Sequence, residues 1–174
     1  YEGSGEFSPI PGVGLSLRKI TKEASLKIAK SAFEIAKSRS VNKSKKSKIH
    51  VVHKANVMKI TDGIFLVACR LVSSKYNDVD YEEMLVDACA AHLVRKPDQF
   101  DVIVTTNMFG DILSDLATEL SGSLGLAGSL NAGKNHAMAQ AQHGAAPDIA
   151  DKNIANPISL ILSSAMLLLS LIHI

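Results

Sequence analysis

The sequence Phe-Asp-Val-Ile-Val-Thr-Thr-Asn-Met-Phe-Gly-Asp-Ile-Leu-Ser-Asp, residues 100–115, contains the change from strand to helix on which the predicted architecture rests. Its first five residues, 100–104, are rich in β-branched side chains, which is typical of a strand buried on both faces. Residues 107–110 interrupt this run, and from Asp111 the apolar residues recur at helical spacing. The stretch therefore predicts a short buried strand followed directly by a helix.

Two carboxylates, Asp111 and Asp115, lie four positions apart in this predicted helix. Side chains at that spacing share one face of a helix, and like charges there repel unless a cation lies between them. Ligand sets made only of oxygen suit Mg²⁺ or Mn²⁺ better than zinc. A first turn whose acids face solvent and favour the helix dipole explains the same spacing. The spacing alone leaves both interpretations open.

Segments with strand and helix patterns alternate along the rest of the chain. Helices are predicted at residues 21–38, 62–76, 81–96 and 158–169, and strands at residues 15–20, 49–53 and 137–140. Residues 1–14, 122–133 and 143–156 lack periodicity and are predicted as loops or irregular segments. This alternation indicates an α/β fold in which helices flank a sheet.

The first two helices carry specific expectations. Thr21 is predicted to cap the first, whose apolar stripe is formed by Ile28, Ala32, Phe33, Ile35 and Ala36. Asp62 is predicted to cap the second helix.

Composition limits the classes of partner. Of the 174 residues, 47% are hydrophobic and 21% are charged, which is ordinary for a globular α/β domain, or for one domain plus part of another. The formal net charge of +2 is too small to indicate a nucleic-acid partner. Lysines gather between Lys37 and Lys48, but serines separate them and aromatic residues are missing, so we expect a solvated loop.

The cysteines and the chain ends bear on the compartment. Cys69 and Cys89 fall among apolar residues of predicted helices, which favours a reducing intracellular compartment such as the cytoplasm or mitochondrial matrix. Residues 158–174 are short for a membrane span and contain several serines, so we predict a core helix and no membrane partner. The first residue is Tyr1 rather than Met, so we expect the natural chain to begin earlier.

Three segments that follow predicted strands carry polar side chains: residues 53–56, 106–111 and 140–143. In open α/β sheets, ligands collect beyond the carboxyl ends of the strands, so chemistry from these segments is expected to meet at one edge. Lys54 directly follows a strand, where nearby positive charge and desolvation would lower its pKa and suit it to proton transfer. An ordinary lysine at a strand end is the alternative.

Two further features are ambiguous on the residues alone. Asp87 lies among apolar residues, where a carboxylate is costly to bury without a cation, so it is either a metal ligand or a residue at the edge of the apolar face. The sequence His-Gly-Ala-Ala-Pro-Asp-Ile at 143–149, followed by Asn156, has small residues that let a flat ligand approach and an acid able to accept two ribose hydroxyls. It contains no G-x-G-x-x-G fingerprint.

Three motifs together resemble the β-decarboxylating dehydrogenases, the isocitrate and isopropylmalate dehydrogenase family. They are His-Lys-Ala-Asn at 53–56 with Asp62-Gly63, Asn-Met-Phe-Gly-Asp-Ile-Leu-Ser-Asp at 107–115, and His-Gly-Ala-Ala-Pro-Asp-Ile-Ala at 143–150 with Ala-Asn-Pro at 155–157. The likeness extends from about residue 12 to residue 168. It implies a partial fold of that family, with a substrate, metal and dimerisation segment at about 12–100 and part of the cofactor-binding large domain at about 100–170.

The resemblance also implies an activity and roles for residues. Family members oxidise a 2-hydroxy acid that carries a carboxylate at C3, using a nicotinamide cofactor and a divalent metal, and release CO₂. The implied metal ligands are Asp87, Asp111 and Asp115. The implied catalytic residues are Lys54 and Asp87, with Lys54 as a proton carrier that also binds substrate, and Asn56 is a substrate- or nicotinamide-side contact. The implied nicotinamide-ribose contact is Asn107, and the adenosine contacts are His143, Gly144, Asp148 and Asn156. An acid at 148 repels a 2′-phosphate, so the implied cofactor is NAD together with Mg²⁺ or Mn²⁺.

His53 resembles the NAD-isocitrate or homoisocitrate branch more than the isopropylmalate branch, so an isocitrate-like substrate is expected. Relatives are dimers or larger, and the resemblance implies that Lys54 and Asp87 reach into the site of a partner subunit in a homo- or hetero-oligomer. The alternatives are an isopropylmalate or homoisocitrate dehydrogenase and a non-catalytic regulatory subunit of an NAD-isocitrate dehydrogenase. The intact lysine and the three acids argue against the regulatory role.

The sequence also departs from the family. The family's first half and its last helices have no counterpart here, so we expect a fragment, and Tyr1 is not assigned the family's catalytic tyrosine role. Ala145 replaces a usual serine or threonine. Asp151 replaces a customary glycine, which would strain the loop if that position has positive φ.

Overall fold

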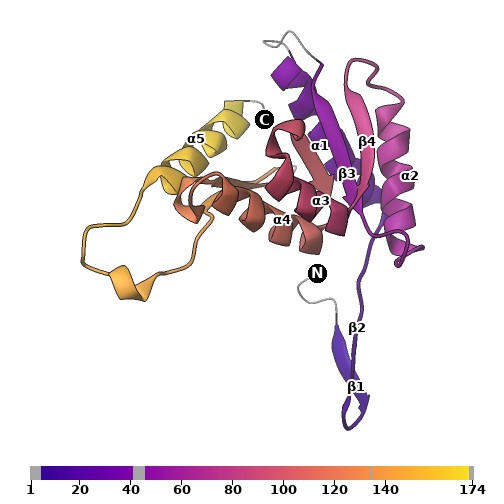
Figure 1. Ribbon diagram of the computed structural model, residues 1–174, viewed down its shortest axis with the longest axis horizontal. Coiled ribbons are helices and arrows are strands. Elements are labelled where there is room, and N and C mark those ends of the chain that lie inside the picture. Colours follow the sequence, from indigo (N-terminus) through magenta and orange to yellow (C-terminus); the bar gives the residue numbers. More distant parts are fainter. Residues whose placement is uncertain (1–4, 41–45, 134, 173–174) are drawn as a thin grey trace. The chain divides into compact units, whose positions relative to one another are not determined.

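The computed structural model describes residues 5–40, 46–133 and 135–172, and the chain divides into two compact units, Tyr1–Leu113 and Ser114–Ile174. The fold is α/β with sheets flanked by helices, as predicted (Figure 1). The elements of the first unit are β1 (Glu6–Ile10), β2 (Val13–Ser16), α1 (Lys22–Ser40), β3 (Lys48–His53), α2 (Thr61–Ser73), β4 (Asp80–Leu85), α3 (Val86–Arg95), a 3₁₀ turn (Pro97–Gln99), β5 (Val102–Thr105) and the start of α4 (Asn107–Leu120).

A parallel sheet with the order β4-β3-β5 forms the centre of the first unit. Val52 pairs with Thr105 and His53 pairs with Leu85, so all three strands end at the same edge. The segments after β3 and β5 therefore meet at this edge, as the sequence predicts for residues 53–56 and 106–111. The third segment, residues 140–143, belongs to the second unit, and its place at this edge stays a prediction.

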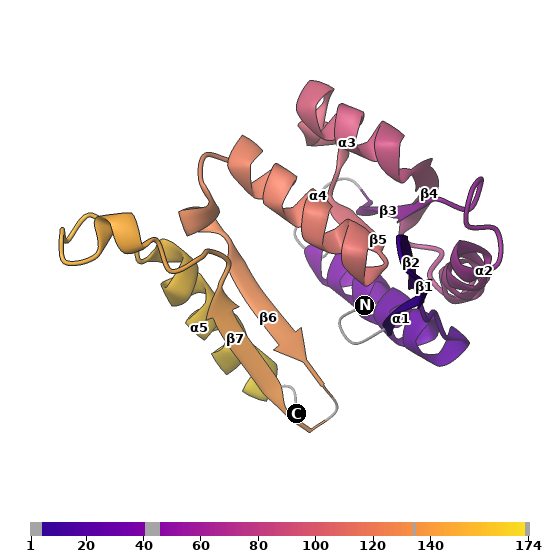
Figure 2. The same ribbon diagram turned by 90° about the horizontal axis from the view of Figure 1, so that it is seen from below.

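Helices cover both faces of the sheet (Figure 2). Ile49 and Val51 of β3 and Val104 of β5 pack with Phe33 of α1 and Phe65 of α2 in one apolar cluster. Helix α3 lies on the opposite face and buries Cys89 and Leu93. The core thus fixes β3 and β5, the two strands that end next to the predicted site.

The helix predicted at 81–96 is wrong in its first half. Residues Asp80–Leu85 form β4 and pair with six consecutive residues of β3, and the helix begins only at Val86. Glu82 and Glu83 have low strand propensity, which hid the strand in the sequence. Pairing with a central strand overrides that local preference.

Two other predictions for the first unit need correction. Residues 1–14 were expected to form a loop and 15–20 an edge strand, whereas β1 and β2 form an antiparallel hairpin within residues 6–16.

Thr21 caps α1 as predicted, since its Oγ1 accepts the Ala24 N–H at 3.2 Å. Ile28 and Ile35 do not belong to the buried stripe, because they are 48% and 49% exposed. The stripe is instead formed by Ser25, Ala29, Ala32, Phe33 and Ala36, at spacings of three and four.

The second unit contains β6 (Gly128–Ala132), β7 (Ala137–Ala141) and α5 (Ile158–Ile172), with 3₁₀ turns at Leu124–Leu126 and Pro147–Ile149. The strands pair antiparallel, which confirms the predicted strand at 137–140 and corrects the loop predicted at 122–133. Two buried serines join α5 to the hairpin. Ser163 accepts the Ser129 N–H at 3.0 Å and donates to the Gln140 carbonyl, and Ser159 accepts the Gln142 N–H at 3.1 Å. Within the described residues, no helix has the length and apolar character needed to span a membrane.

Cys69 and Cys89 are buried, unpaired and helical, as predicted. Burial raises their pKa values to about 12 and about 11, respectively, so both thiols stay protonated at neutral pH. The predictions for Tyr1 and for residues 41–45 of the lysine-rich loop lie outside the described residues.

Candidate functional site

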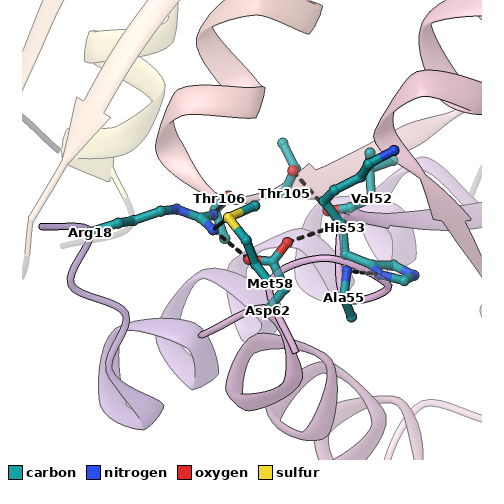
Figure 3. Close-up of polar contacts among 9 residues, drawn as sticks. Arg18, Val52, His53, Ala55, Met58, Asp62, Thr105 and Thr106 are labelled. Carbon is teal, nitrogen blue, oxygen red and sulfur yellow. Dashed lines mark hydrogen bonds and ion pairs between the residues drawn. The ribbon is translucent and has the colours of Figure 1, made fainter. Parts of the chain in front are cut away.

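The backbone after β3 is held by a buried carboxylate (Figure 3). Asp62 has no exposed surface; its Oδ2 accepts the Lys54 N–H at 2.6 Å, and its Oδ1 accepts Arg18 Nη1 at 2.6 Å. Asp62 was predicted to cap α2, but residue 60 occupies the cap position and no side-chain cap hydrogen bond forms there. Asp62 does not cap the helix because both of its carboxylate oxygens accept hydrogen bonds from groups outside α2.

Lys54 and Asp87 are in direct contact. Lys54 Nζ donates to Asp87 Oδ1 at 2.8 Å, and this hydrogen bond holds the pKa of Asp87 below its usual range. Asp87 is exposed in the first turn of α3 rather than buried among apolar residues. The structure therefore brings together the candidate proton carrier and one candidate metal ligand at the end of β3.

The other two candidate metal ligands, Asp111 and Asp115, are exposed on α4, one turn apart, as predicted. Asp115 Oδ1 accepts a hydrogen bond from Gln142 Nε2 at 3.0 Å, and the same amide nitrogen donates to Ser114 Oγ at 3.1 Å. The carboxylate pair supplies the oxygen donors that Mg²⁺ or Mn²⁺ prefers.

Across the described part of a single chain, no three His, Cys, Asp or Glu side chains gather closely enough to hold a metal ion. The donor chemistry of Asp111 and Asp115 fits a hard cation, but a complete ligand set needs at least one further donor. The sequence-based hypothesis draws Asp87 from a partner subunit, which one chain by itself does not test.

Two further predicted contacts, Asn56 and Asn107, and the neighbouring His53 lie at the strand ends. Asn56 and Asn107 are exposed beside the two strand ends. His53 Nδ1 accepts the Ala55 N–H at 3.1 Å, and burial lowers the pKa of this ring, so it is neutral at physiological pH. His53 therefore shapes the turn that carries Lys54 and Asn56.

A cavity of about 770 Å³ opens in the loop between β7 and α5. His143, Gly144 and Asn156, three of the four predicted adenosine contacts, line it. Asn156 also caps α5, since its Oδ1 accepts the Ile158 N–H at 3.0 Å. The fourth contact, Asp148, is exposed in the 3₁₀ turn of the same loop. The cavity has the size of a small-molecule ligand site.

The same loop contains three non-glycine residues in the left-handed region: Ala146 at φ 44°, Asp151 at φ 61° and Asn153 at φ 54°. All three line the cavity. Asp151 therefore has the positive φ under which strain was expected at this position. Left-handed backbone is costly for alanine, whereas aspartate and asparagine tolerate it better.

Sequence reasoning missed Arg18 and gave no individual role to Thr106 or Gln142, which lie in the polar segments 106–111 and 140–143. Arg18 contacts residues 44 and 88 positions further along the chain, and no local pattern signals such contacts. Asp62-Gly63 did stand out, because it accompanies the motif at 53–56. The Lys54 N–H at the end of a buried strand requires a hydrogen-bond acceptor, and this requirement was the signal in the sequence that an acid such as Asp62 would lie near it.

Comparisons with known proteins agree with the motifs. The family model described as isocitrate/isopropylmalate dehydrogenase matches residues 4–173. Over 94% of its length, the chain is 47% identical to a chloroplastic 3-isopropylmalate dehydrogenase of Solanum tuberosum, and equally to the mitochondrial catalytic subunit 5 of NAD isocitrate dehydrogenase of Arabidopsis thaliana. Over 97% of its length it is 47% identical to a mitochondrial regulatory subunit of NAD isocitrate dehydrogenase from Dictyostelium discoideum.

Solved structures match as well. The TT0538 protein of Thermus thermophilus superposes with a TM-score of 0.90 at 40% identity, covering 98% of this chain and 34% of that one. An isocitrate dehydrogenase of Methylococcus capsulatus superposes with a TM-score of 0.85 at 43% identity, covering 92% of this chain and 46% of that one. The chain spans 44%, 42% and 48% of the three curated relatives named above.

Proposed function

Because the chain belongs to the isocitrate/isopropylmalate dehydrogenase family, we propose that it serves the oxidative decarboxylation of an isocitrate-like 2-hydroxy acid, with NAD and Mg²⁺ or Mn²⁺. The observation that carries the proposal is the contact between Lys54 and Asp87 at the carboxyl edge of the parallel sheet. A charged amine and an acid meet there beside Asn56 and Asn107, where α/β sheets bind their ligands.

The residues of this edge have complementary roles. Lys54 exchanges a proton with the substrate in the site of the partner subunit. Asp87 is free to join the metal site of that subunit once a ligand replaces it as the partner of the Lys54 amine. Asp111 and Asp115 supply oxygen ligands, and a bound divalent metal would polarise the hydroxyl and carboxylate of the substrate. Asn56 contacts the substrate and Asn107 the nicotinamide ribose.

The cavity in the second unit is the proposed adenosine site, formed by His143, Gly144 and Asn156. Asp148 in the same loop accepts the ribose hydroxyls and disfavours a 2′-phosphate by charge repulsion, which supports NAD over NADP. Substrate choice within the family rests on His53, which favours isocitrate over 3-isopropylmalate, with homoisocitrate as the related alternative.

An oligomer is part of the proposal, since relatives are named as catalytic and regulatory subunits. The hairpin β1–β2 exposes Phe7, Ile10 and Leu15 at 50%, 61% and 47%, which is suited to contact with another subunit. We propose at least a dimer, with Lys54 and Asp87 placed at the site of the partner subunit. A reducing organelle or the cytoplasm is the proposed compartment, in keeping with the relatives named as chloroplastic or mitochondrial.

The direct test is an assay of NAD reduction by the full-length protein with isocitrate, 3-isopropylmalate and homoisocitrate, with and without Mn²⁺. We expect turnover with isocitrate that requires the metal and is lost in Asp111→Asn. The matched control is Asp98→Asn, an exposed aspartate of the 3₁₀ turn after α3, which should leave turnover unchanged. Full activity of Asp111→Asn would refute the metal assignment.

A regulatory subunit is the second candidate, favoured by the similarity to the regulatory protein of Dictyostelium. It predicts no turnover without a catalytic partner. Calorimetric titration of Mn²⁺ and isocitrate into the intact protein separates the two, since binding with the affinity of a substrate supports the enzyme and absence of binding supports the regulatory role.

A further inference from the structure

The guanidinium of Arg18 connects three segments that are far apart in the sequence (Figure 3). Nη1 donates to Asp62 Oδ1 at 2.6 Å and approaches Met58 Sδ at 3.1 Å, and Nη2 donates to Thr106 Oγ1. The same group lies 5.1 Å from the centre of the Phe109 ring. One side chain therefore contacts the turn after β3, the start of α2 and the start of α4.

Asp62 completes this connection. Its side chain is fully buried, so an unpaired charge there would be strongly unfavourable. Arg18 neutralises the charge, and the second oxygen accepts the backbone N–H of Lys54 at 2.6 Å. The carboxylate thus fixes the backbone from which the Lys54 side chain extends to Asp87.

The contact with Thr106 acts on the other strand end. Thr106 is the residue before α4, and its carbonyl accepts the Gly110 N–H at 2.9 Å, which is a hydrogen bond of the first helical turn. Thr105 beside it donates from Oγ1 to the Val52 carbonyl at 2.8 Å. The start of α4, which carries Asn107 and Asp111, is thereby held against the end of β3.

We propose that Arg18 and Asp62 form a positioning pair that fixes two strand ends of the chain at once. One end carries Lys54, which serves the site of the partner subunit, and the other carries Asn107 and Asp111, which serve the site of their own chain. The inference rests on the proposed function for the role of those three residues. Neither member of the pair extends to the substrate. The Arg18 guanidinium is taken up by the side chains of Asp62 and Thr106, and the Asp62 carboxylate by Arg18 and the Lys54 N–H. Their effect is to hold the proton carrier of the partner's site and the metal-binding helix of the chain's own site in fixed positions.

The test compares Arg18→Ala, Arg18→Lys and Asp62→Asn in the full-length protein under the NAD-reduction assay. We expect kcat to fall about a hundredfold in Arg18→Ala, because displacement of reacting groups by about 1 Å has effects of that size. KM for NAD should change much less than kcat, because adenosine binding is assigned to the loop at 143–156 and only the Asn107 contact with NAD lies at the displaced strand end. Arg18→Lys should recover only part of kcat, since the single ammonium of lysine cannot bind Asp62 and Thr106 with the two-pronged geometry of a guanidinium.

The matched control is Arg39→Ala, which removes an exposed arginine paired with Asp101 at 3.2 Å in the same unit. It should leave kcat unchanged. Thermal unfolding of every variant distinguishes displacement of the site residues in a folded protein from loss of the fold itself. A folded Arg18→Ala variant with kcat within about threefold of the parent would overturn the proposal.

Amide hydrogen exchange gives a readout that does not depend on the dehydrogenase assignment. In Arg18→Ala and Asp62→Asn, the Lys54 amide should exchange at least about tenfold faster, whereas the Val51 amide in the middle of β3 should keep its protection. If the parent protein reduces no NAD, the proposed function fails. Amide exchange at Lys54 then tests by itself whether Arg18 and Asp62 position the backbone. Unchanged exchange at Lys54 in both variants would contradict it.

Discussion

The edge of the sheet in the first unit and the loop at 143–156 in the second hold their backbones in different ways. At the edge, Arg18, Asp62 and Thr106 fix two strand ends by hydrogen bonds that are partly buried. In the loop, most residues are exposed, and Ala146 and Asp151 adopt left-handed backbone without being glycine. The edge thus depends on side chains, whereas the loop has a backbone that a glycine would suit better.

This difference separates two kinds of preorganisation. A site fixed by paired buried charges loses both stability and geometry when one partner is removed. A strained loop can gain stability from a substitution while its ligand affinity changes independently. The variants below test whether the two regions respond in these opposite directions.

The largest effect is expected for Asp62→Ala, which leaves the Arg18 guanidinium without its carboxylate. The free energy of unfolding should fall by about 3–5 kcal/mol, as for other broken buried pairs. Urea denaturation measures it. The control is Glu34→Gln, which breaks an exposed pair with Lys30 at 3.6 Å and should cost less than about 0.5 kcal/mol. Equal effects of the two substitutions would remove the distinction between a buried and an exposed pair.

The next effect tests whether the loss of stability on substitution depends on how closely a residue is packed rather than on the unit to which it belongs. A Cβ added to Gly128 in β6 would lie 2.9 Å from Met166 Sδ and 3.2 Å from the Ser163 backbone nitrogen in α5. Gly128→Ala should therefore lower the free energy of unfolding by about 1–3 kcal/mol. Gly144→Ala is the control, because an added Cβ there meets nothing within 4 Å. A stable Gly128→Ala protein would show that α5 is packed less closely than the structure indicates.

Ala146→Gly should raise stability, which is the opposite direction to the edge variants. Releasing an alanine from φ 44° gains about 1 kcal/mol, partly offset by the greater entropy of glycine in the unfolded chain. Asp151→Gly should gain less, since aspartate tolerates the left-handed region better. Thermal melting of both variants checks the order, and a loss of stability in Ala146→Gly would show that the loop is not strained there.

The smallest effect concerns acid pH. Hydrogen bonds from Arg70 hold the pKa of Glu83 below its ordinary value, and Tyr81 contributes a second hydrogen bond. Near and below the ordinary pKa, the unfolded chain binds more protons at this position than the folded one, so the stabilisation is present at neutral pH and is lost as pH falls. Because Arg70 is 58% exposed, the effect should be below about 1 kcal/mol. Glu83→Gln should flatten the dependence of stability on pH in the acid range, and an unchanged slope would contradict the assignment.

The sequence predicts most of the elements whose signal is local. The β-branched runs indicated β3 and β5, and the helical spacing after residue 110 indicated α4 with Asp111 and Asp115 on one face. The motifs also marked the loop whose cavity contains His143 and Asn156. These features depend on neighbouring residues, so they are visible in a single sequence.

The remaining features depend on distant partners. Strand β4 contains Glu82 and Glu83 and becomes a strand only because β3 pairs with it. The sequence predicts Asp62 as a helix cap, but it lies in the first turn of α2, and its oxygens bind Arg18 and Lys54, which only the folded chain brings near. The role of Arg18 has no local signature at all.

The central claim is that Asp111 and Asp115 hold a divalent metal for the chemistry assigned to Lys54. Its most direct test is titration of Mn²⁺ into the full-length protein with isocitrate present, with free Mn²⁺ measured by electron paramagnetic resonance. We predict that Asp111→Asn and Asp115→Asn each weaken Mn²⁺ binding about tenfold or more, whereas Asp98→Asn binds like the parent. Binding of equal strength in all four proteins would contradict the claim.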